Sequence, residues 1–127
     1  MSRCGTCPKS RASSRSIAAA GPIVNFSAPT SFTTGTNPEA VATGDFNGDS
    51  DPDVAIANEV SGTISVLVGA AGGTFTGPTN YTAGSGPSGL AVGDFNGDSD
   101  PDLAVANEGA NTVSVLLGGA GGSFSAP

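Results

Sequence analysis

The chain has 127 residues, enough for one modest domain, and its hydrophobic fraction of 37% argues against a disordered polymer despite 20 glycines and 9 prolines. All four basic residues lie in the first fifteen positions, and all eleven acidic residues lie from Glu39 onward. Such an acidic body repels nucleic-acid phosphates and anionic lipid surfaces, and it suits divalent cations. No apolar stretch is long enough to span a bilayer.

Residues 1–25 are predicted to be a basic leader that is disordered or removed by processing. The apolar run Ile17–Ala20 is short for a signal peptide, although the sequence Ala-Ala-Ala-Gly at 18–21 is a candidate cleavage site. Cys4 and Cys7 form a C-x-x-C pair, but haem attachment needs a following His and a zinc site needs two further ligands. The favoured interpretation is a disordered or locally oxidised pair within the leader, and its role stays open.

The nine residues Asp45–Asp53 recur without change at Asp94–Asp102. The repetition extends well beyond them, because residues 26–74 align with residues 75–123 without a gap, with 29 identities in 49 positions. A third period begins at Phe124-Ser-Ala-Pro127, which repeats the sequence of residues 26–29. Residues 26–127 are therefore predicted to be one segment built from two repeats.

Each repeat is predicted to be all-β, with short apolar or β-branched runs separated by Gly and Pro and no helical periodicity. An outer strand is predicted within residues 26–33, at Thr30–Thr33, followed by a full blade over residues 40–82 and three strands of the next blade over residues 89–117. Four short strands in each tandem repeat are typical of a β-propeller blade. The strands are expected at residues 40–43, 54–57, 63–68 and 79–82, then at 89–92, 103–106 and 112–117, with 54–57 and 103–106 buried on both faces.

Each acidic nonamer places an oxygen-bearing side chain at every second position. Asp and Asn favour turns, but turn formation explains only one or two of them. Calcium takes six to eight oxygen ligands, whereas magnesium keeps its water and is seldom enclosed by protein alone. An EF-hand would need Gly at position 6, Glu at position 12 and flanking helices, which this sequence lacks. The candidate ligands are Asp45, Asn47, Asp49, Asp51 and Asp53, and Asp94, Asn96, Asp98, Asp100 and Asp102.

The phrase Val41-Ala-Thr-Gly-Asp-Phe-Asn-Gly-Asp-Ser-Asp-Pro-Asp-Val-Ala-Ile-Ala-Asn58 resembles the FG-GAP/VCBS repeat of integrin-type β-propellers, and the second copy fits as well. The resemblance implies one structural Ca²⁺ in each repeat. It also implies that positions 1, 3, 5 and 9 bind through side chains, while Asp51 and Asp100 bind through their carbonyls. The family usually has Gly at position 6, where this chain has Ser50 and Ser99.

The resemblance implies a calcium-binding extracellular or cell-surface module that binds protein or glycan, as in adhesion. A non-catalytic role is expected, because the chain has no His and no nucleophile–base pair. An alternative is a structural subunit that assembles head to tail, in which the N-terminal outer strand of one copy completes the last blade of the next. Three copies would then make a six-bladed ring, or the contacts would continue into a filament. A fragment of a longer propeller and an accessory propeller of an enzyme are the remaining alternatives.

Overall fold

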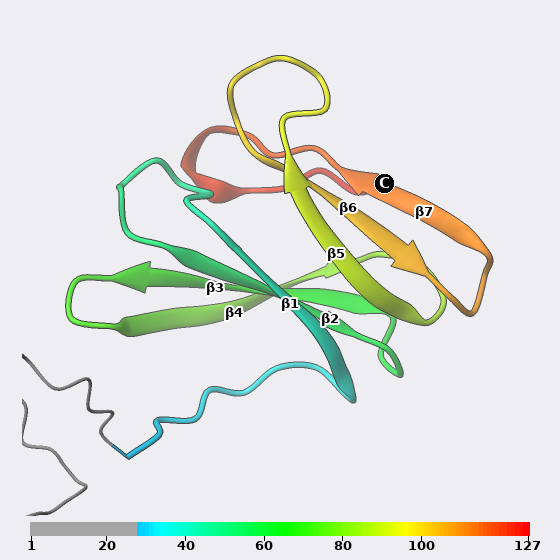
Figure 1. The fold of residues 1–127 in the computed structure, drawn as a ribbon, viewed down its shortest axis with the longest axis horizontal. Helices are drawn as coiled ribbons and strands as arrows, with labels where there is room; N and C mark the ends of the chain where they lie inside the picture. The colour runs from blue at the N-terminus through cyan, green and yellow to red at the C-terminus, as the bar shows by residue number, and fades with distance from the viewer. Residues whose placement is uncertain (1–27) are drawn as a thin grey trace, which may run out of the picture. The chain divides into compact units, whose positions relative to one another are not determined.

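A computed structural model describes residues 28–127, and its regular structure is β-sheet (Figure 1). Residues 32–127 form one unit that contains two antiparallel sheets, each with its strands in sequence order. The first sheet has the order β1-β2-β3-β4 and the second has the order β5-β6-β7. The strands are β1 (Pro38–Gly44), β2 (Asp53–Asn58), β3 (Thr63–Ala70), β4 (Thr74–Thr82), β5 (Pro87–Gly93), β6 (Asp102–Asn107) and β7 (Thr112–Leu116), followed by the 3-10 turn η1 (Ala120–Gly122).

The connections follow the local sequence. Asn37 and Gly86 have φ values of 59° and 66°, and each precedes a proline where the chain turns into β1 and β5. Gly72 and Gly73 have φ values of 83° and 77° in the tight β3–β4 hairpin. Glycine adopts this left-handed region at little cost, which explains the Gly-rich sequence there. The hairpin lets β3 and β4 run on beyond the predicted strands 63–68 and 79–82.

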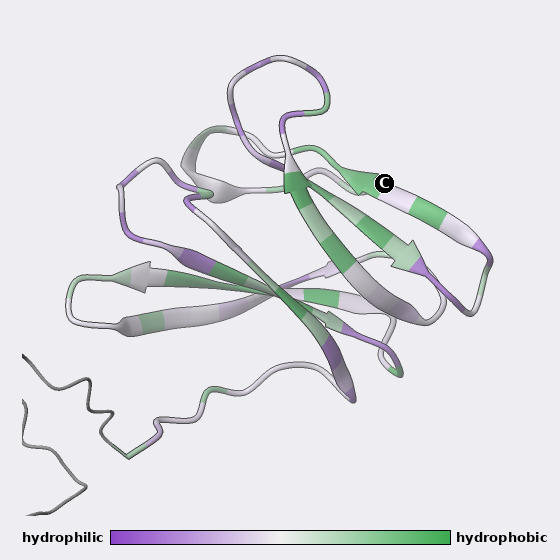
Figure 2. Ribbon diagram, in the orientation of Figure 1, coloured by the Kyte–Doolittle hydropathy of each residue, from purple (hydrophilic) through white to green (hydrophobic). Residues whose placement is uncertain are grey.

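The two sheets pack face to face through apolar side chains (Figure 2). The pairing of β2 with β3 places Ala57 opposite Ile64 and Ala55 opposite Val66, so all four lie on one face. The second sheet contributes Leu103, Val105 and Leu116, which lie together because residue 103 pairs with 116 and residue 105 with 114. These residues are buried and form the core between the sheets. At this interface the strand β5 contacts both β1 and β2.

The second sheet has the beginning of a fourth strand. Gly118 forms a single antiparallel bridge with Phe124, which is the same rung as Gly69 with Phe75 in the first sheet. Ser125 extends this contact, because its N–H donates to the carbonyl of Leu117 at 2.8 Å. Within the part of the chain that the structure describes, no strand pairs with the outer edge of β7.

All-β architecture and blade-like sheets are confirmed, and two expectations need correction. Thr30–Thr33 is not a strand, because residues 28–34 have no regular structure. Its counterpart, residues 79–82, pairs with β3 of its own blade, whereas residues 30–33 have no strand to pair with among residues 28–127. The run 103–106 is buried on one face only, since Ala106 on the other face is exposed. The leader 1–25, Cys4 and Cys7 lie outside the described residues, and no helix among residues 28–127 is long and apolar enough to cross a membrane.

Candidate metal centre

The two acidic loops connect the first and second strands of each sheet, β1 to β2 and β5 to β6 (Figure 1). In both loops the first Asp accepts hydrogen bonds from three backbone N–H groups. Asp45 Oδ1 accepts from Gly48 and Asp49 at 2.9 and 3.1 Å, and its Oδ2 accepts from Ser50 at 2.8 Å. The following chain is therefore wrapped around one carboxylate.

These hydrogen bonds also change the acidity of the first Asp. The N–H of Ser50 is the main cause that lowers the pKa of Asp45 below its usual value of 3.8, against an opposing effect of desolvation. In the second loop the N–H of Ser99 lowers the pKa of Asp94 in the same way. A carboxylate that accepts backbone hydrogen bonds is favoured in its charged form, so this position stays ionised at neutral pH.

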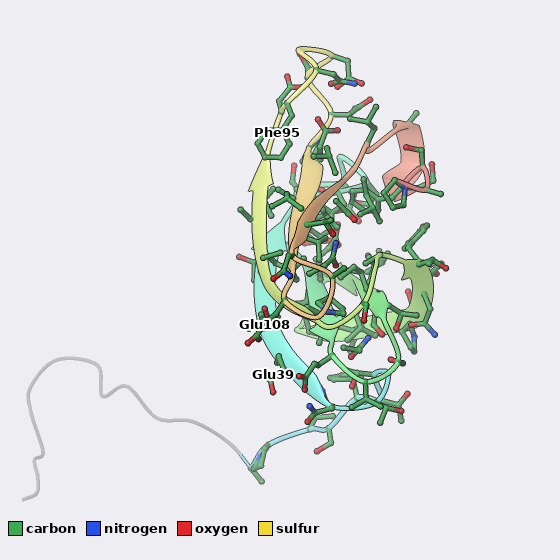
Figure 3. All side chains as sticks on the ribbon, turned by 90° about the vertical axis from the view of Figure 1, so that its right-hand side faces the viewer. Glu39, Phe95 and Glu108 are labelled. Atoms are coloured by element: carbon green, nitrogen blue, oxygen red, sulfur yellow. The ribbon has the colours of Figure 1, made fainter. Side chains whose placement is uncertain are left out.

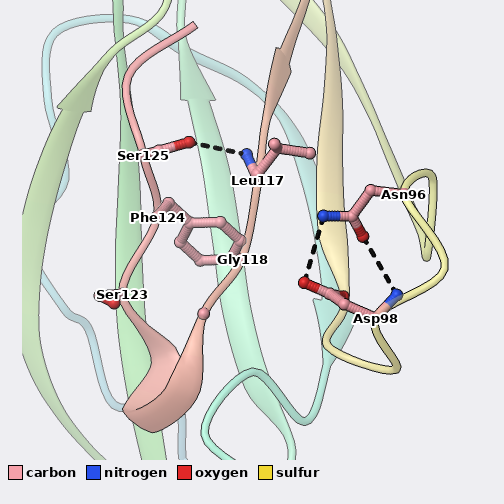
Figure 4. Close-up of a pocket in the computed structure, with 8 residues that line it drawn as sticks. Asn96, Asp98, Leu117, Gly118, Ser123, Phe124 and Ser125 are labelled. Carbon is pink, nitrogen blue, oxygen red and sulfur yellow. Dashed lines mark hydrogen bonds between the residues drawn. The ribbon is translucent and has the colours of Figure 1, made fainter.

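The middle of each loop is held by side-chain contacts. In the second loop, Asn96 Nδ2 donates to Asp98 Oδ2 at 3.1 Å, and the N–H of Asp98 donates to Asn96 Oδ1 at 3.3 Å (Figure 4). The N–H of Asp100 donates to Asp98 Oδ1 at 2.9 Å. Asn47, Asp49 and Asp51 make the same three contacts in the first loop, at 3.1, 3.3 and 2.9 Å.

The last Asp of each loop is fully buried, and it ties the loop to the third strand. Asp53 Oδ2 accepts the N–H of Phe46 at 2.7 Å, and its Oδ1 accepts the N–H of Gly69 at 2.8 Å. Asp102 makes the equivalent bonds to Phe95 and Gly118, both at 2.8 Å. This structural role adds to the predicted role as a ligand, because each carboxylate oxygen has a second lone pair.

Close approach of the chain at this junction requires glycine. A Cβ on Gly69 would lie 2.0 Å from the carbonyl oxygen of Pro52, and a Cβ on Gly118 would lie equally close to that of Pro101. No side chain fits at this distance, so Gly69 in β3 and Gly118, two residues after β7, allow the chain to reach the buried carboxylates.

The structure brings several of the candidate ligands together. In the second loop, one carboxylate oxygen from each of Asp94, Asp98 and Asp102 lies within 4.8 Å of the other two. Asp100 is outside this group, and its assignment as a carbonyl ligand stays a prediction. The backbone hydrogen bonds of the two loops agree closely. Among the described residues, however, only the carboxylates of the second loop come within 4.8 Å of one another.

This donor set fits a hard divalent cation. Each loop offers carboxylate and amide oxygens, which are the ligands that calcium takes, and it contains no nitrogen or sulfur ligand. Eight of the eleven acidic residues lie in the two loops, and residues 16–127 contain no Lys, Arg or His. A cation bound among these carboxylates would reduce their mutual repulsion.

Position 6 of each loop has a left-handed backbone conformation but is occupied by serine rather than glycine. Ser50 and Ser99 have φ values of 71° and 73°, in the left-handed region that favours glycine. An L-residue other than glycine is strained there. The loops therefore keep their shape with serine at position 6, at a cost in stability.

Sequence reasoning missed the aromatic contacts that position the first loop. Phe46 is buried against Phe124 of the second sheet, with ring centroids 5.4 Å apart and an interplanar angle of 75°. Tyr81 also packs edge to face on Phe124, with ring centroids 5.6 Å apart. A Cβ on Gly122 would lie 3.0 Å from Asn47 Cβ, so the second sheet's last hairpin lies directly against the first loop. The recurrence of Phe after the first Asp was the available signal.

The network around two buried asparagines was also missed. Asn58 Nδ2 donates to Ser65 Oγ at 2.9 Å, and Asn107 Nδ2 donates to Ser114 Oγ at 2.8 Å. Both asparagines end the second strand of their sheet and are buried. Their place at the same position in each repeat indicates a structural role in holding the second strand to the third.

Comparison with family models finds a match within the repeated segment. Residues 45–105 match the model for the FG-GAP-like repeat, a stretch that runs from the first acidic loop through the second and into β6. Neither the curated proteins nor the solved structures give a significant match to the chain.

Proposed function

We propose, from the premise that this chain carries FG-GAP-like repeats, that each acidic loop binds one calcium ion and that the chain is a calcium-stabilised module of the propeller type. The observation that carries this proposal is the convergence of Asp94, Asp98 and Asp102 in a loop whose backbone hydrogen bonds are duplicated in the first repeat. The bound ion would offset the repulsion of four carboxylates within nine residues.

The ligands proposed for the first ion are the side chains of Asp45, Asn47, Asp49 and Asp53 with the carbonyl of Asp51. Those for the second ion are the side chains of Asp94, Asn96, Asp98 and Asp102 with the carbonyl of Asp100. The ion stabilises the folded chain, because it binds a loop that exists only when both strands flanking it are formed.

The module is proposed to act outside the cell or on its surface, as a non-catalytic binding element for protein or glycan. A polar hollow of ≈ 410 Å³ supports a binding role, since it lies between the first loop and the end of the second. Its lining includes Asp45, Asn47, Ser99 and Asp100, together with the turn around Ala120. The lack of His in the whole chain supports a non-catalytic role.

Isothermal titration of the chain with Ca²⁺ tests the proposal. The wild type is expected to bind two ions. The Asp98→Asn variant is expected to bind one, and the double variant Asp49→Asn, Asp98→Asn is expected to bind none. Saturation at about one hundred times the dissociation constant would stabilise the fold by about 2.7 kcal/mol for each site, which a urea titration with and without EDTA measures.

Glu108→Gln is the matched control, because it removes one negative charge outside the loops. Glu108 is exposed and lies toward the opposite end of the strands from Phe95 of the second loop (Figure 3). This variant is expected to keep both ions. Equal weakening by Asp98→Asn and Glu108→Gln would show nonspecific attraction of Ca²⁺ to an acidic surface, and absence of binding by the wild type would refute the proposal.

A further inference from the structure

The interface between the two sheets uses one face of each repeat. The first sheet presents Ile64 and Val66 of β3, and the second sheet receives them with a face that contains Val105 and Leu116. Because the two repeats have nearly the same sequence, each sheet carries both kinds of face. Within residues 28–127, one face of each sheet is used in this interface, and the other face of each is not in contact with a second sheet.

The other face of the second sheet is equivalent by the repeat to the face that the first sheet buries, but it is exposed. Val113 and Val115 of β7 occupy the repeat positions of Ile64 and Val66. Val113 is 67% exposed, whereas Ile64 is 0% exposed. Ala104 and Ala106 lie opposite Val115 and Val113 on the same face, so this apolar surface extends over two strands.

The acidic loops show the same asymmetry. Phe46 of the first loop is 3% exposed beneath Phe124, whereas Phe95 of the second loop is 53% exposed. The ring of Phe95 stands beside the end of β5 (Figure 3). In the first loop this aromatic position contacts the hairpin of the following sheet, and in the second loop that contact is unfilled within residues 28–127.

The unused face of the first sheet has the matching chemistry. Its residues Val41, Ile56 and Leu67 occupy the repeat positions of Leu90, Val105 and Leu116, which receive the first sheet within the chain. Val41 is 66% exposed and lines an apolar groove of ≈ 350 Å³ together with Ile56, whereas Ile56 and Leu67 are themselves 7% and 5% exposed. The face therefore resembles the one that already binds a sheet of this sequence.

An aromatic pair in the first sheet lacks one of the neighbours that its counterpart in the second sheet has. Phe32 packs edge to face on Phe75 with centroids 5.3 Å apart, and the pair repeats the packing of Tyr81 on Phe124. Phe124 has Phe46 as a second aromatic neighbour. Phe75 is the counterpart of Phe124, and Phe95 is the counterpart of Phe46. The neighbour that Phe75 lacks would therefore be the exposed Phe95 of another copy.

We propose that a second copy of this chain docks head to tail, placing its β5–β7 sheet on the unused face of the first sheet. Val113 and Val115 of one copy pack into the groove lined by Val41 and Ile56 of the next, and Phe95 contacts Phe75. The occupant is a copy of this chain because the new interface would continue the existing one with equivalent residues at every position.

The pairing of strands follows from the same correspondence. Val66 pairs with Thr79 within the first sheet, and the corresponding pair between copies is Val115 with Thr30. Thr30–Thr33 of one copy would thus form the fourth strand on β7 of the other, adding a strand to an open sheet edge. This pairing accounts for the lack of regular structure in residues 28–34 of the isolated chain.

Charge sets the conditions for docking. Every copy carries eleven acidic residues beyond position 38 and no basic residue beyond position 15, so two copies repel each other. Calcium in the loops would weaken this repulsion, and so would salt, because exposed charges are screened at high ionic strength. Docking is a separate property from calcium binding, since one chain contains every ligand of both loops.

Sedimentation velocity over a wide range of chain concentration, in excess Ca²⁺, tests the docking. The wild type is expected to form species larger than the monomer. Val113→Glu is expected to weaken this association at least about tenfold, because it buries a charge in an apolar contact. Val60→Glu is the matched control: Val60 is 68% exposed in the β2–β3 turn, away from both faces, and its substitution is expected to leave association unchanged.

Disulfide trapping tests the register. In a Cys4→Ser, Cys7→Ser background, a mixture of Thr30→Cys chains and Val115→Cys chains is expected to form covalent heterodimers under mild oxidation. Ser31→Cys is the out-of-register control and is expected to cross-link less with Val115→Cys, because neighbouring residues in a strand point to opposite faces.

A chain that stays monomeric at all concentrations with both calcium ions bound would overturn the docking and leave calcium binding intact. Association that Val113→Glu and Val60→Glu weaken equally would overturn the assigned face. Conversely, association in high salt by the Asp49→Asn, Asp98→Asn variant would support docking even if calcium binding failed. Rings and open polymers both contain the proposed contact and both support it.

Discussion

The rings of Phe46 and Phe124 pack edge to face, 5.4 Å apart, and join the first acidic loop to the second sheet. The same loop is fixed to its own sheet by Asp53, which accepts the N–H groups of Phe46 and Gly69. One residue, Phe46, therefore couples the shape of the candidate metal site to the packing of the two sheets. A change at this residue is expected to affect both.

The repeat supplies a matched pair for testing this coupling. Phe46→Ala is expected to destabilise the fold by about 3–5 kcal/mol, because it empties a buried aromatic site. Phe95→Ala, at the equivalent but exposed position, is expected to cost about 1 kcal/mol or less in the monomer. Urea unfolding at low chain concentration measures both values. Equal losses would contradict the burial of Phe46 between the sheets.

Substitutions of Asp102 and Asp100 distinguish the structural role of the loop carboxylates from their role as ligands. Asp102→Asn is expected to cost about 1.5–3 kcal/mol in EDTA, because a buried carboxylate that accepts two backbone N–H groups is replaced by an amide. Asp100→Asn is expected to have a much smaller effect under the same conditions, since Asp100 is only half-buried. Similar losses without calcium would show that Asp102 has no special structural role.

The strained serines offer a route to a more stable chain. Ser50→Gly and Ser99→Gly are each expected to stabilise the fold by up to about 1 kcal/mol, because relief of left-handed strain exceeds the entropy that glycine adds to the unfolded chain. Ser85→Gly serves as the control, because Ser85 lacks a positive φ and its replacement is expected to destabilise. The midpoint of thermal unfolding in EDTA reports the sign, and a loss in the Ser50 and Ser99 variants would contradict the strain.

The acid dependence of stability follows from Asp45 and Asp94. Backbone N–H groups lower the pKa of both carboxyls in the folded chain, so the unfolded chain binds more protons near the usual value of 3.8. Their contribution to stability is therefore present above that value and is lost as the pH falls through the lowered pKa. Urea midpoints measured in EDTA across this range are expected to become lower as the pH is lowered. The fall is expected to be shallower in the Asp45→Asn, Asp94→Asn variant, and an unchanged slope would contradict the assignment.

The positions of the strands and loops were predictable because their causes are local. Alternating β-branched residues, Gly and Pro punctuation and the exact duplication of nine residues predict all seven strands in order. Their bounds lie within about two residues of those observed, except that β4 begins at Thr74 rather than at residue 79. The strand expected at Thr30–Thr33 was wrong because strand formation needs a neighbouring strand, and no sequence pattern within the segment reports whether that neighbour exists.

Differences between equivalent residues were not predictable from local sequence. Phe46 and Phe95 lie in identical nonamers, yet one is buried and the other exposed, because within residues 28–127 only the first is packed against another sheet. The burial of Asp53 was not predictable either. A regular series of acidic residues does not indicate that the last one accepts a hydrogen bond from Gly69 inside the sheet. The clustering of Asp94, Asp98 and Asp102 followed from their spacing, but the backbone hydrogen bonds that hold them did not.

The junction between the sheets has a consequence for how such a chain can evolve. Each acidic loop is held to its own repeat through its last Asp, and the first loop is also held to the following sheet through Phe46. A gene duplication or deletion of one whole 49-residue period would recreate the same junction with the same partners, so blade number can change in a single genetic event. A duplication of any other length would separate an Asp from its Gly, or a Phe from its hairpin, and selection would remove it.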